Sequence, residues 1–189
     1  PETSLPVHTA WDLGMDDATS IWFFQQHKSE IRLVYYYENS GEGFPHYARE
    51  LNRWAVQKGV TFGKHYAPHD IKVRELGTGK SRLEVARSLG LKFTPVRKLA
   101  VQDGIEGVRN ILPRCWFSRM ACAVGIEHLK GYHKEWDSSR QVFRKTPVHD
   151  NNSHGADAFR TLAMGLKEER TYGKHKKRPT SYEVTNVNW

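Results

Sequence analysis

Three aspartates at the ends of predicted secondary-structure elements could together hold a divalent cation. Asp12 ends one extended run, Asp70 follows another, and Asp157 lies near the start of a predicted helix. Carboxylates within a few ångströms of one another repel, and a stable protein tolerates them when a hard cation neutralises them. Mg²⁺ and Mn²⁺ prefer such oxygen ligands and keep water for exchange with substrate. The three residues therefore indicate metal-assisted chemistry on a phosphate ester.

Each acid also has a purely structural interpretation. Asp12 and Asp16 fit turn chemistry, and Asp70 fits a loop that follows Pro68. Asp157 fits the interaction of a carboxylate with a helix N-terminus, which stabilises by about 0.3–1 kcal/mol. Taken singly, each acid is better explained in these ways, so only the combination favours a site.

The first third of the chain predicts a β-meander followed by a helix. Residues 7–12, 18–26 and 31–38 are rich in β-branched and aromatic side chains and predict consecutive antiparallel strands. The period of apolar residues then changes, and residues 44–58 predict a helix that Gly59 ends.

The rest of the chain alternates between strands and helices. The predicted elements are a strand at 61–68, a helix at 81–89 with a Ser81–Glu84 capping box, a strand at 91–96, helices at about 101–112 and 119–133, a hairpin at 134–147 and a last helix at about 153–169. This order predicts an α/β fold with a mixed sheet covered on both sides. Such a sheet brings distant residues together at one end of its strands, where we expect the aspartates to meet.

Composition predicts one folded domain with a basic surface. The 189 residues are 38% hydrophobic and include six Trp, which is sufficient for one core. A net charge of +8 suits a polyanion such as nucleic acid, and a basic surface without a specific partner explains it equally well. We expect a domain at 1–169 and a flexible basic tail at 170–189, where apolar residues are few.

The sequence shows no sign of a disulfide framework, a membrane span or a signal peptide. Cys115 and Cys122 lack the spacing of a disulfide framework or a zinc site, so we expect reduced thiols in an intracellular chain. No apolar run approaches the roughly 18 to 20 residues of a membrane span, and no signal peptide is visible. The chain starts at Pro1 rather than Met, so we expect a fragment of a longer protein.

Three motifs contain the candidate acids: DLGMDDAT after the first strand, HYAPHD at the end of the fourth, and PVHDNNSHGADAFRTLAMG near the end. Together they resemble the nuclease domain of the large terminase subunit of tailed bacteriophages. The resemblance spans about residues 7–169, and the HD-x-x-SH-x-AD-A-x-R run is its most specific part. It implies a ribonuclease H-like fold and a metal-dependent endonuclease that cuts concatemeric double-stranded viral DNA during genome packaging.

The resemblance makes Asp12, Asp70 and Asp157 the catalytic, metal-binding triad, and Asp16 matches a further acidic position of the first motif. It implies two divalent cations, Mg²⁺ or Mn²⁺, about 3.5 to 4 Å apart, for in-line hydrolysis of phosphodiesters. Asp12 would bridge both ions, and the N-terminus of the last helix would help to keep Asp157 ionised in its first turn. Basic residues on the rim would hold DNA phosphates, the candidates being Lys72, Arg74, Lys80, Arg82 and Arg144.

The resemblance also implies partners and a location. The family's full-length subunit carries an ATPase motor domain before the nuclease domain, and it works with a small terminase subunit and the procapsid portal. This chain contains no Walker motif, so we expect no ATP hydrolysis by it. We expect a monomeric isolated domain, an oligomeric full-length subunit, and a location in the cytoplasm of the infected bacterium, transiently at the portal, with neither secretion nor membrane binding.

Two other functions stay open. Another ribonuclease H-like nuclease, of the resolvase or transposase type, would use the same metal chemistry. A non-catalytic DNA-binding or docking module would use only the basic tail and the aromatic surface. Cleavage that depends on a divalent metal separates the nucleases from the module.

Two patterns mimic other sites. GTGKS at 77–81 departs from the phosphate-binding P-loop because position 74 is Arg74 instead of Gly. His65 and His69 have the spacing of a helical zinc pair, but the segment predicts a strand and contains Pro68. For His69 and His154, which lie near proposed ligands, a structural hydrogen bond is the preferred role.

Overall fold

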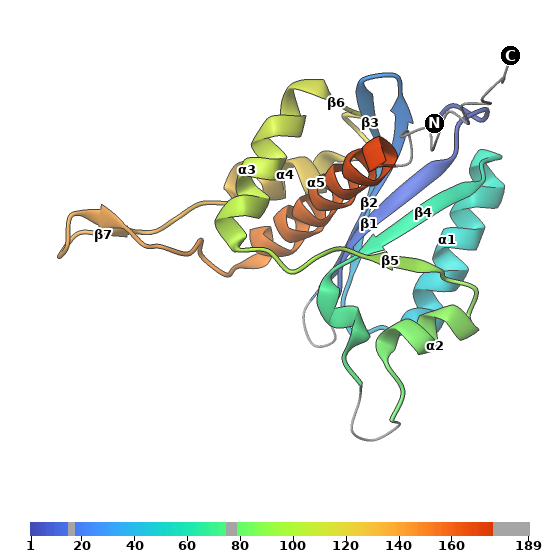
Figure 1. The fold of residues 1–189 in the computed structure, drawn as a ribbon, viewed down its shortest axis with the longest axis horizontal. Helices are drawn as coiled ribbons and strands as arrows, with labels where there is room; N and C mark the ends of the chain where they lie inside the picture. The colour runs from blue at the N-terminus through green and yellow to red at the C-terminus, as the bar shows by residue number, and fades with distance from the viewer. Residues whose placement is uncertain (15–17, 75–78, 176–189) are drawn as a thin grey trace, which may run out of the picture.

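A six-stranded mixed sheet forms the centre of the computed structural model, which describes residues 1–14, 18–74 and 79–175. The strand order is β5-β4-β1-β2-β3-β6 (Figure 1). The strands are β1 (Val7–Asp12), β2 (Thr19–His27), β3 (Glu30–Asn39), β4 (Phe62–Ala67), β5 (Phe93–Pro95) and β6 (Cys115–Phe117).

The strand directions bring several carboxyl ends to one edge. β1, β2 and β3 form the predicted antiparallel meander. β4 runs parallel to β1, β5 runs parallel to β4, and β6 runs parallel to β3. Consequently β1, β4 and β5 all end at the same edge of the sheet as β3.

Helices cover both faces of the sheet, as predicted (Figure 1). One face carries α3 (Val101–Ile111), α4 (Ala123–Gly131) and α5 (Asn151–His175), and the other carries α1 (Phe44–Lys58) and α2 (Arg82–Ser88). Short 3-10 turns are η1 (His69–Lys72) and η2 (Leu112–Arg114), and a separate two-stranded ribbon is made of β7 (Trp136–Asp137) and β8 (Val142–Phe143).

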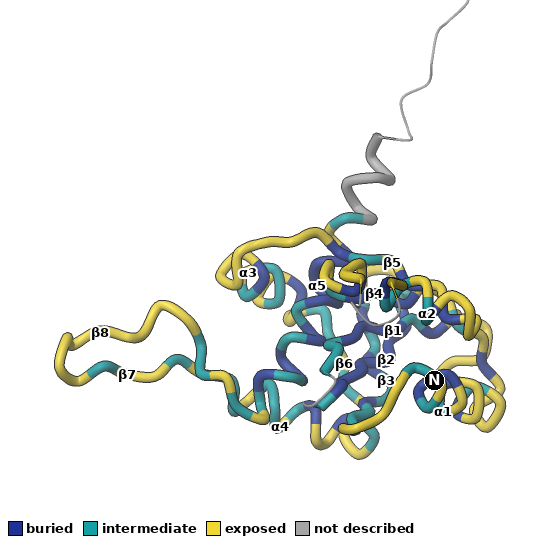
Figure 2. Tube along the Cα trace, turned by 90° about the horizontal axis from the view of Figure 1, so that it is seen from below, coloured by how far each residue is buried: buried dark blue, intermediate teal, exposed yellow. Residues whose placement is uncertain are grey.

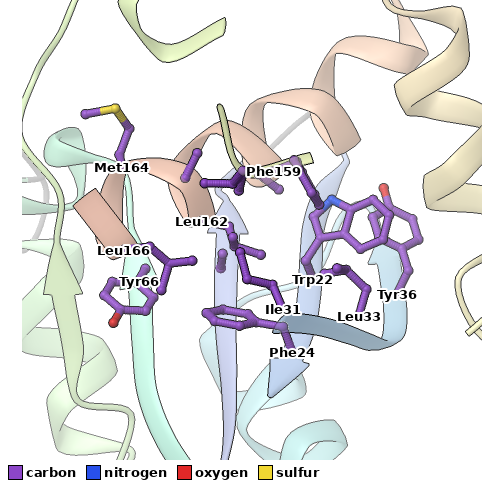
Figure 3. Packing of buried hydrophobic residues seen from close by; sticks show 14 of the residues in the cluster. Trp22, Phe24, Ile31, Leu33, Tyr36, Tyr66, Phe159, Leu162, Met164 and Leu166 are labelled. Atoms are coloured by element: carbon purple, nitrogen blue, oxygen red, sulfur yellow. The ribbon is translucent and has the colours of Figure 1, made fainter. Parts of the chain in front are cut away.

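Alternate side chains of β2 enter two hydrophobic cores because the strand is buried on both faces. Toward α5, Trp22 packs edge-on against Phe159 with ring centroids 5.2 Å apart (Figure 3). Toward α1, Phe23 packs against Trp54 at 4.8 Å. These aromatic contacts fix α5 and α1 on opposite sides of the strand.

Local sequence signals determine the ends of α1 and α2. Gly59 adopts φ 63°, which favours glycine, and its N–H bonds to the carbonyls of Ala55 and Val56. Ser81 Oγ accepts from the N–H of Glu84 at 3.1 Å, and Glu84 Oε2 accepts from the N–H of Ser81 at 2.7 Å. The predicted helix stop and the predicted capping box are both confirmed.

Two elements differ from the prediction. The sequence predicts a connection between helices where β6 lies, yet β6 pairs with β3 as the edge strand. α5 begins at Asn151 instead of about Ser153, because Asp150 Oδ1 accepts from the N–H of Asn152 at 2.9 Å and caps the helix. It continues to His175, six residues past the predicted end at Glu169, and residues 176–189 of the predicted tail lie outside the described part.

Cys115 and Cys122 are free thiols, and burial raises the pKa of each to about 12. Among the described helices, none combines the length and apolarity of a membrane span.

Candidate active site

The predicted aspartates of β1 and β4 lie at the edge where these two parallel strands end. Ala10 on β1 pairs in register with Tyr66 on β4, so both strands stop within two residues of this pair. Asp12 is the last residue of β1, and its side chain is 26% exposed. Beyond β4, Pro68 turns the chain into η1, where Asp70 is the second residue and is exposed.

The first turns of α5 are fixed against the sheet near the same edge. Trp22 Nε1 on β2 donates a hydrogen bond of 2.8 Å to the carbonyl oxygen of Gly155. A Cβ at Gly155 would lie 2.8 Å from His128 Cβ and 2.9 Å from the Tyr36 hydroxyl. Only glycine permits this close approach, which places Asp157, two residues further along α5, at the sheet edge.

His154 links Asp12 to α5. Its Nδ1 lies 3.3 Å from Asp12 Oδ2, an ion pair when the imidazole is protonated. The rings of His154 and His149 meet at 5.5 Å, and Ser153 Oγ lies 3.0 Å from His149 Nδ1. Two imidazoles therefore stand beside the acids.

Asp157 occupies a crowded, partly buried position. Its Oδ1 is buried and has no hydrogen bond within the described structure, although Arg160 Nη1 lies 3.3 Å away as an ion-pair partner. Burial raises the pKa of the Asp157 carboxyl, the Arg160 guanidinium opposes this rise, and the Asp12 carboxylate adds to it. The Asp12 carboxylate is thus near enough for its charge to disfavour ionisation of Asp157.

The predicted place of Asp157 in the first helical turn is wrong. Because Asp150 caps α5 and the helix begins at Asn151, Asp157 lies in the second turn. Burial is the largest influence on the pKa of its carboxyl, and it disfavours the charged form.

Three residues around Asp157 were not singled out by sequence analysis. His149 and Arg160 belong to the HD-x-x-SH-x-AD-A-x-R run, and the i, i+3 spacing of Asp157 and Arg160 was a usable signal. Tyr132 follows α4, where burial raises its pKa and the Asp157 carboxylate raises it further. No local pattern identifies Tyr132, because its contact with α5 joins separate elements.

The charge of Asp12 reaches Asp157, whereas Asp70 follows the neighbouring strand β4. The structure describes no hydrogen bond or ion pair between Asp70 and either of the others. Within residues 1–14, 18–74 and 79–175, no three His, Cys, Asp or Glu side chains lie close enough to form a metal-binding group. Asp16 lies outside the described residues. The triad stays a prediction, of which the geometry supports one pair.

The five predicted DNA-binding cations lie in two places. Four belong to η1, to the start of α2 or to the chain between them, and are Lys72, Arg74, Lys80 and Arg82. There Arg74 forms an isolated antiparallel bridge with Ser81, the residue that caps α2. Arg144 directly follows β8 at the end of the β7-β8 ribbon, which projects in a different direction (Figure 1).

Of the two histidines with zinc-like spacing, His65 and His69, the structure explains His65 as a core residue. His65 is in β4 and His69 is in η1, so they share no helix face. Burial lowers the pKa of His65 to about 4, and its Nδ1 lies 2.6 Å from Thr9 Oγ1. His65 is therefore a neutral core residue near neutral pH.

Known structures share this fold, whereas no protein-family model and no curated protein sequence matches the chain. The large terminase of a thermophilic bacteriophage is 18% identical, with a TM-score of 0.65 over 88% of this chain and 41% of that one. The large-terminase nuclease domain of P22 is 19% identical, with a TM-score of 0.61 over 88% and 84%. The nuclease domain of the large terminase of bacteriophage SPP1, with bound Mn, is 11% identical, with a TM-score of 0.59 over 86% of each chain.

These likenesses establish the fold. The central mixed sheet flanked by helices is that of the ribonuclease H-like terminase nuclease domains, which confirms the predicted fold class. The chain spans about two fifths of the thermophilic phage's large terminase and most of the two separate nuclease domains.

Proposed function

We propose that this chain, whose fold is that of the large-terminase nuclease domains, is a divalent-metal-dependent endonuclease that cuts concatemeric double-stranded viral DNA during genome packaging. The observation that carries the proposal is the link between Asp12 at the end of β1 and the start of α5, where His154 Nδ1 lies 3.3 Å from Asp12 Oδ2, three residues before Asp157. Asp157 Oδ1 is buried without a hydrogen bond in the described structure, and besides the ion pair with Arg160 at 3.3 Å a buried carboxylate oxygen of this kind calls for a further partner. A bound cation would be that partner.

The residue types near this sheet edge suit a hard divalent cation. Asp12 and Asp157 supply the oxygen ligands that Mg²⁺ and Mn²⁺ prefer, and Asp70 stands beyond the neighbouring parallel strand, where it would complete the set. The bound Mn of the SPP1 nuclease domain supports this choice of metal. Two cations would neutralise the carboxylates, provide an activated water and stabilise the leaving oxygen for in-line hydrolysis of the phosphodiester.

The chain's own residues would hold the acids in place. His154 contacts Asp12 and limits its rotamers, while Arg160 balances part of the charge of Asp157. The Trp22–Gly155 hydrogen bond ties α5 to β2, so the distance between the two acids depends on a packed contact instead of a loop. Such preorganisation spares the site from ordering its ligands at the moment of binding.

Several partners belong to the same proposal. Double-stranded DNA would be the substrate, and the exposed cations around the η1–α2 connection would hold its phosphates. Because the chain spans about two fifths of the thermophilic phage's large terminase, we propose an ATPase domain elsewhere in the full subunit. The small terminase subunit and the procapsid portal would be the assembly partners.

The direct test is conversion of supercoiled plasmid in Mg²⁺, Mn²⁺ or EDTA. We expect nicking and linearisation with either metal, none in EDTA, and at least about a hundredfold loss in Asp12→Asn and Asp157→Asn. Glu106→Gln is the matched control, since it neutralises an exposed carboxylate that pairs with Arg109 on the surface of α3. Full cutting by Asp157→Asn would refute the assignment of Asp157 to a metal site.

A second measurement follows metal binding without activity. A cation that binds only the folded state stabilises it by about 2.7 kcal/mol at a hundred times its Kd. Titrated Mn²⁺ should therefore raise the melting temperature of the wild type and of Glu106→Gln, but not of Asp157→Asn. An equal rise in all three proteins would place the bound metal elsewhere, and DNA binding without cutting in any metal would favour a binding module.

A further inference from the structure

The segment 134–147, called the hairpin arm below, projects from the body of the molecule between α4 and α5 (Figure 1). Nearly all of its length is exposed (Figure 2). At its base His133 and Val148 join the two sides through a backbone hydrogen bond of 3.0 Å. The arm therefore leaves the body immediately before His149, the first residue of the histidine pair beside the acids.

The arm is ordered by its own contacts. Trp136 on β7 pairs with Phe143 on β8, with ring centroids 5.0 Å apart and ring planes at 74°. Glu135 forms an ion pair of 3.1 Å with Arg144 Nε. At the tip Asp137 Oδ1 accepts from the N–H groups of Ser139 and Arg140 at 3.1 Å each. The two-stranded ribbon thus has a defined shape away from the core.

The arm exposes apolar side chains to water, which is unfavourable unless another molecule covers them. Trp136 is 49% exposed, Val142 51% and Phe143 61%. An isolated two-stranded hairpin is marginally stable in water, and exposed aromatic clusters usually mark binding surfaces. A partner that covers the aromatic pair would stabilise the arm.

The charges on the arm favour a polyanion. It carries four cations, Lys134, Arg140, Arg144 and Lys145, against two acids. Both acids are already engaged, Glu135 by Arg144 and Asp137 by the turn. Aromatic side chains among cations suit a nucleic acid, which offers base and sugar surfaces between phosphates.

We propose that the hairpin arm enters a groove of double-stranded DNA beside the cleavage position, with Trp136 and Phe143 against bases and sugars and Arg140 on a phosphate. The inference rests on the proposed nuclease function for its substrate. A two-stranded β-ribbon has the width that the DNA major groove admits, and apolar side chains on such elements can wedge between base steps. Because the base of the arm adjoins His149, DNA held by the arm would pass the carboxylate edge.

The test is the affinity of the whole chain for a fluorescein-labelled duplex of about 30 base pairs in EDTA, measured by anisotropy. The double variant Trp136→Ala/Phe143→Ala should weaken binding at least about tenfold, and Trp136→Phe, which keeps the ring, should bind as the wild type does. Arg140→Gln should reduce the slope of log K against log salt by about 1. Melting temperatures of the variants should match the wild type because the side chains are exposed.

Trp116→Ala is the matched control. Trp116 is 64% exposed on the edge strand β6, so its removal takes away a similar aromatic surface outside the arm. We expect it to leave DNA binding unchanged. Equal weakening by Trp116→Ala, or unchanged binding by the double variant, would overturn the proposal.

Protein docking and the nuclease assignment are tested separately. A double variant that binds DNA normally but loses an oligomer in size-exclusion chromatography with light scattering would assign the arm to a protein contact and overturn the DNA proposal. Since the duplex assay contains EDTA, absence of plasmid cutting by the wild type would count against nuclease activity of this chain alone without affecting the result for the arm.

Discussion

Replacing Gly155 with Ala tests whether close packing of α5 on the sheet sets the position of Asp157. The added Cβ would lie 2.8 Å from His128 Cβ and 2.9 Å from the Tyr36 hydroxyl. Neither neighbour can retreat easily, because His128 meets the methyl group close to the backbone of α4 and Tyr36 is buried in the core. The gap between α5 and α4 must open by about 0.6 Å to reach an ordinary contact of 3.4 Å.

The expected cost follows from that shift. Overpacking of a filled core costs about 1–3 kcal/mol, and the gain from Ala over Gly inside a helix offsets about 0.5–1 kcal/mol of it. We expect Gly155→Ala to lower the free energy of unfolding by about 1–2 kcal/mol, which lowers the melting temperature by about 2–8 °C in a domain of this size. Because a misplacement near 1 Å can cost about a hundredfold in rate, plasmid cutting should fall about tenfold or more.

Gly107→Ala on α3 is the matched control. Its new Cβ would lie 3.7 Å from Ala163 Cβ, an ordinary contact, so the helix gains Ala without a clash. We expect Gly107→Ala to raise the free energy of unfolding by about 0.5–1 kcal/mol and to leave cutting unchanged. Thermal melts and plasmid assays of both variants decide the question. A gain in stability for Gly155→Ala like that of Gly107→Ala would refute the reasoning, and lost stability with unchanged cutting would show that the shift does not reach Asp157.

Three further predictions concern the fold around the site. Burial lowers the pKa of His65 to about 4, below an unfolded value of about 6.5, so between these pH values the unfolded state binds more protons, and the free energy of unfolding falls by up to about 3 kcal/mol as the pH drops through that window. Urea unfolding at about pH 7.5 and about pH 4.5 should show a smaller loss of stability in His65→Leu than in the wild type. Equal losses in the two proteins would contradict a neutral buried His65. Trp22→Phe keeps an aromatic ring but removes the hydrogen bond to Gly155, so it should lower the free energy of unfolding in urea by about 1 kcal/mol or more and reduce cutting. Unchanged stability and unchanged cutting would show that packing alone holds α5. Ser81→Ala removes the side-chain cap of α2 and should cost about 1 kcal/mol, and Ser81→Asp, which retains a capping oxygen, should restore most of it if the cap is the cause.

Elements with strong local signals were predictable from the sequence. α1 has the predicted ends because Pro45 fits its first turn and Gly59 supplies the left-handed residue that stops it. The capping box at Ser81 likewise depends on residues three apart. In both cases the residues that determine the helix end lie within one turn of each other in the sequence, so the sequence pattern alone predicts the contact.

Elements that depend on distant partners were not predictable in the same way. β6 has three residues, too few for a periodic signal, and it exists because Cys115, Trp116 and Phe117 pair with β3 far earlier in the chain. The environment of Asp157 is also nonlocal, since burial and the Asp12 carboxylate raise its pKa and neither influence follows from its position in the helix. Sequence motifs therefore indicated candidate acids but not the influences on the pKa of Asp157.

The acid pair and one hydrophobic core depend on the same helix. α5 buries Phe159 against Trp22 at 5.2 Å (Figure 3). The same Trp22 donates to the carbonyl oxygen of Gly155 one turn earlier. Asp157 lies between these two anchor points, and a helix holds residues at a fixed rise of about 1.5 Å, so repacking of Phe159 must move the carboxylate as well. Core packing and the separation of Asp12 from Asp157 are consequently coupled, which is why a residue as ordinary as a buried tryptophan on β2 should affect cutting without touching DNA.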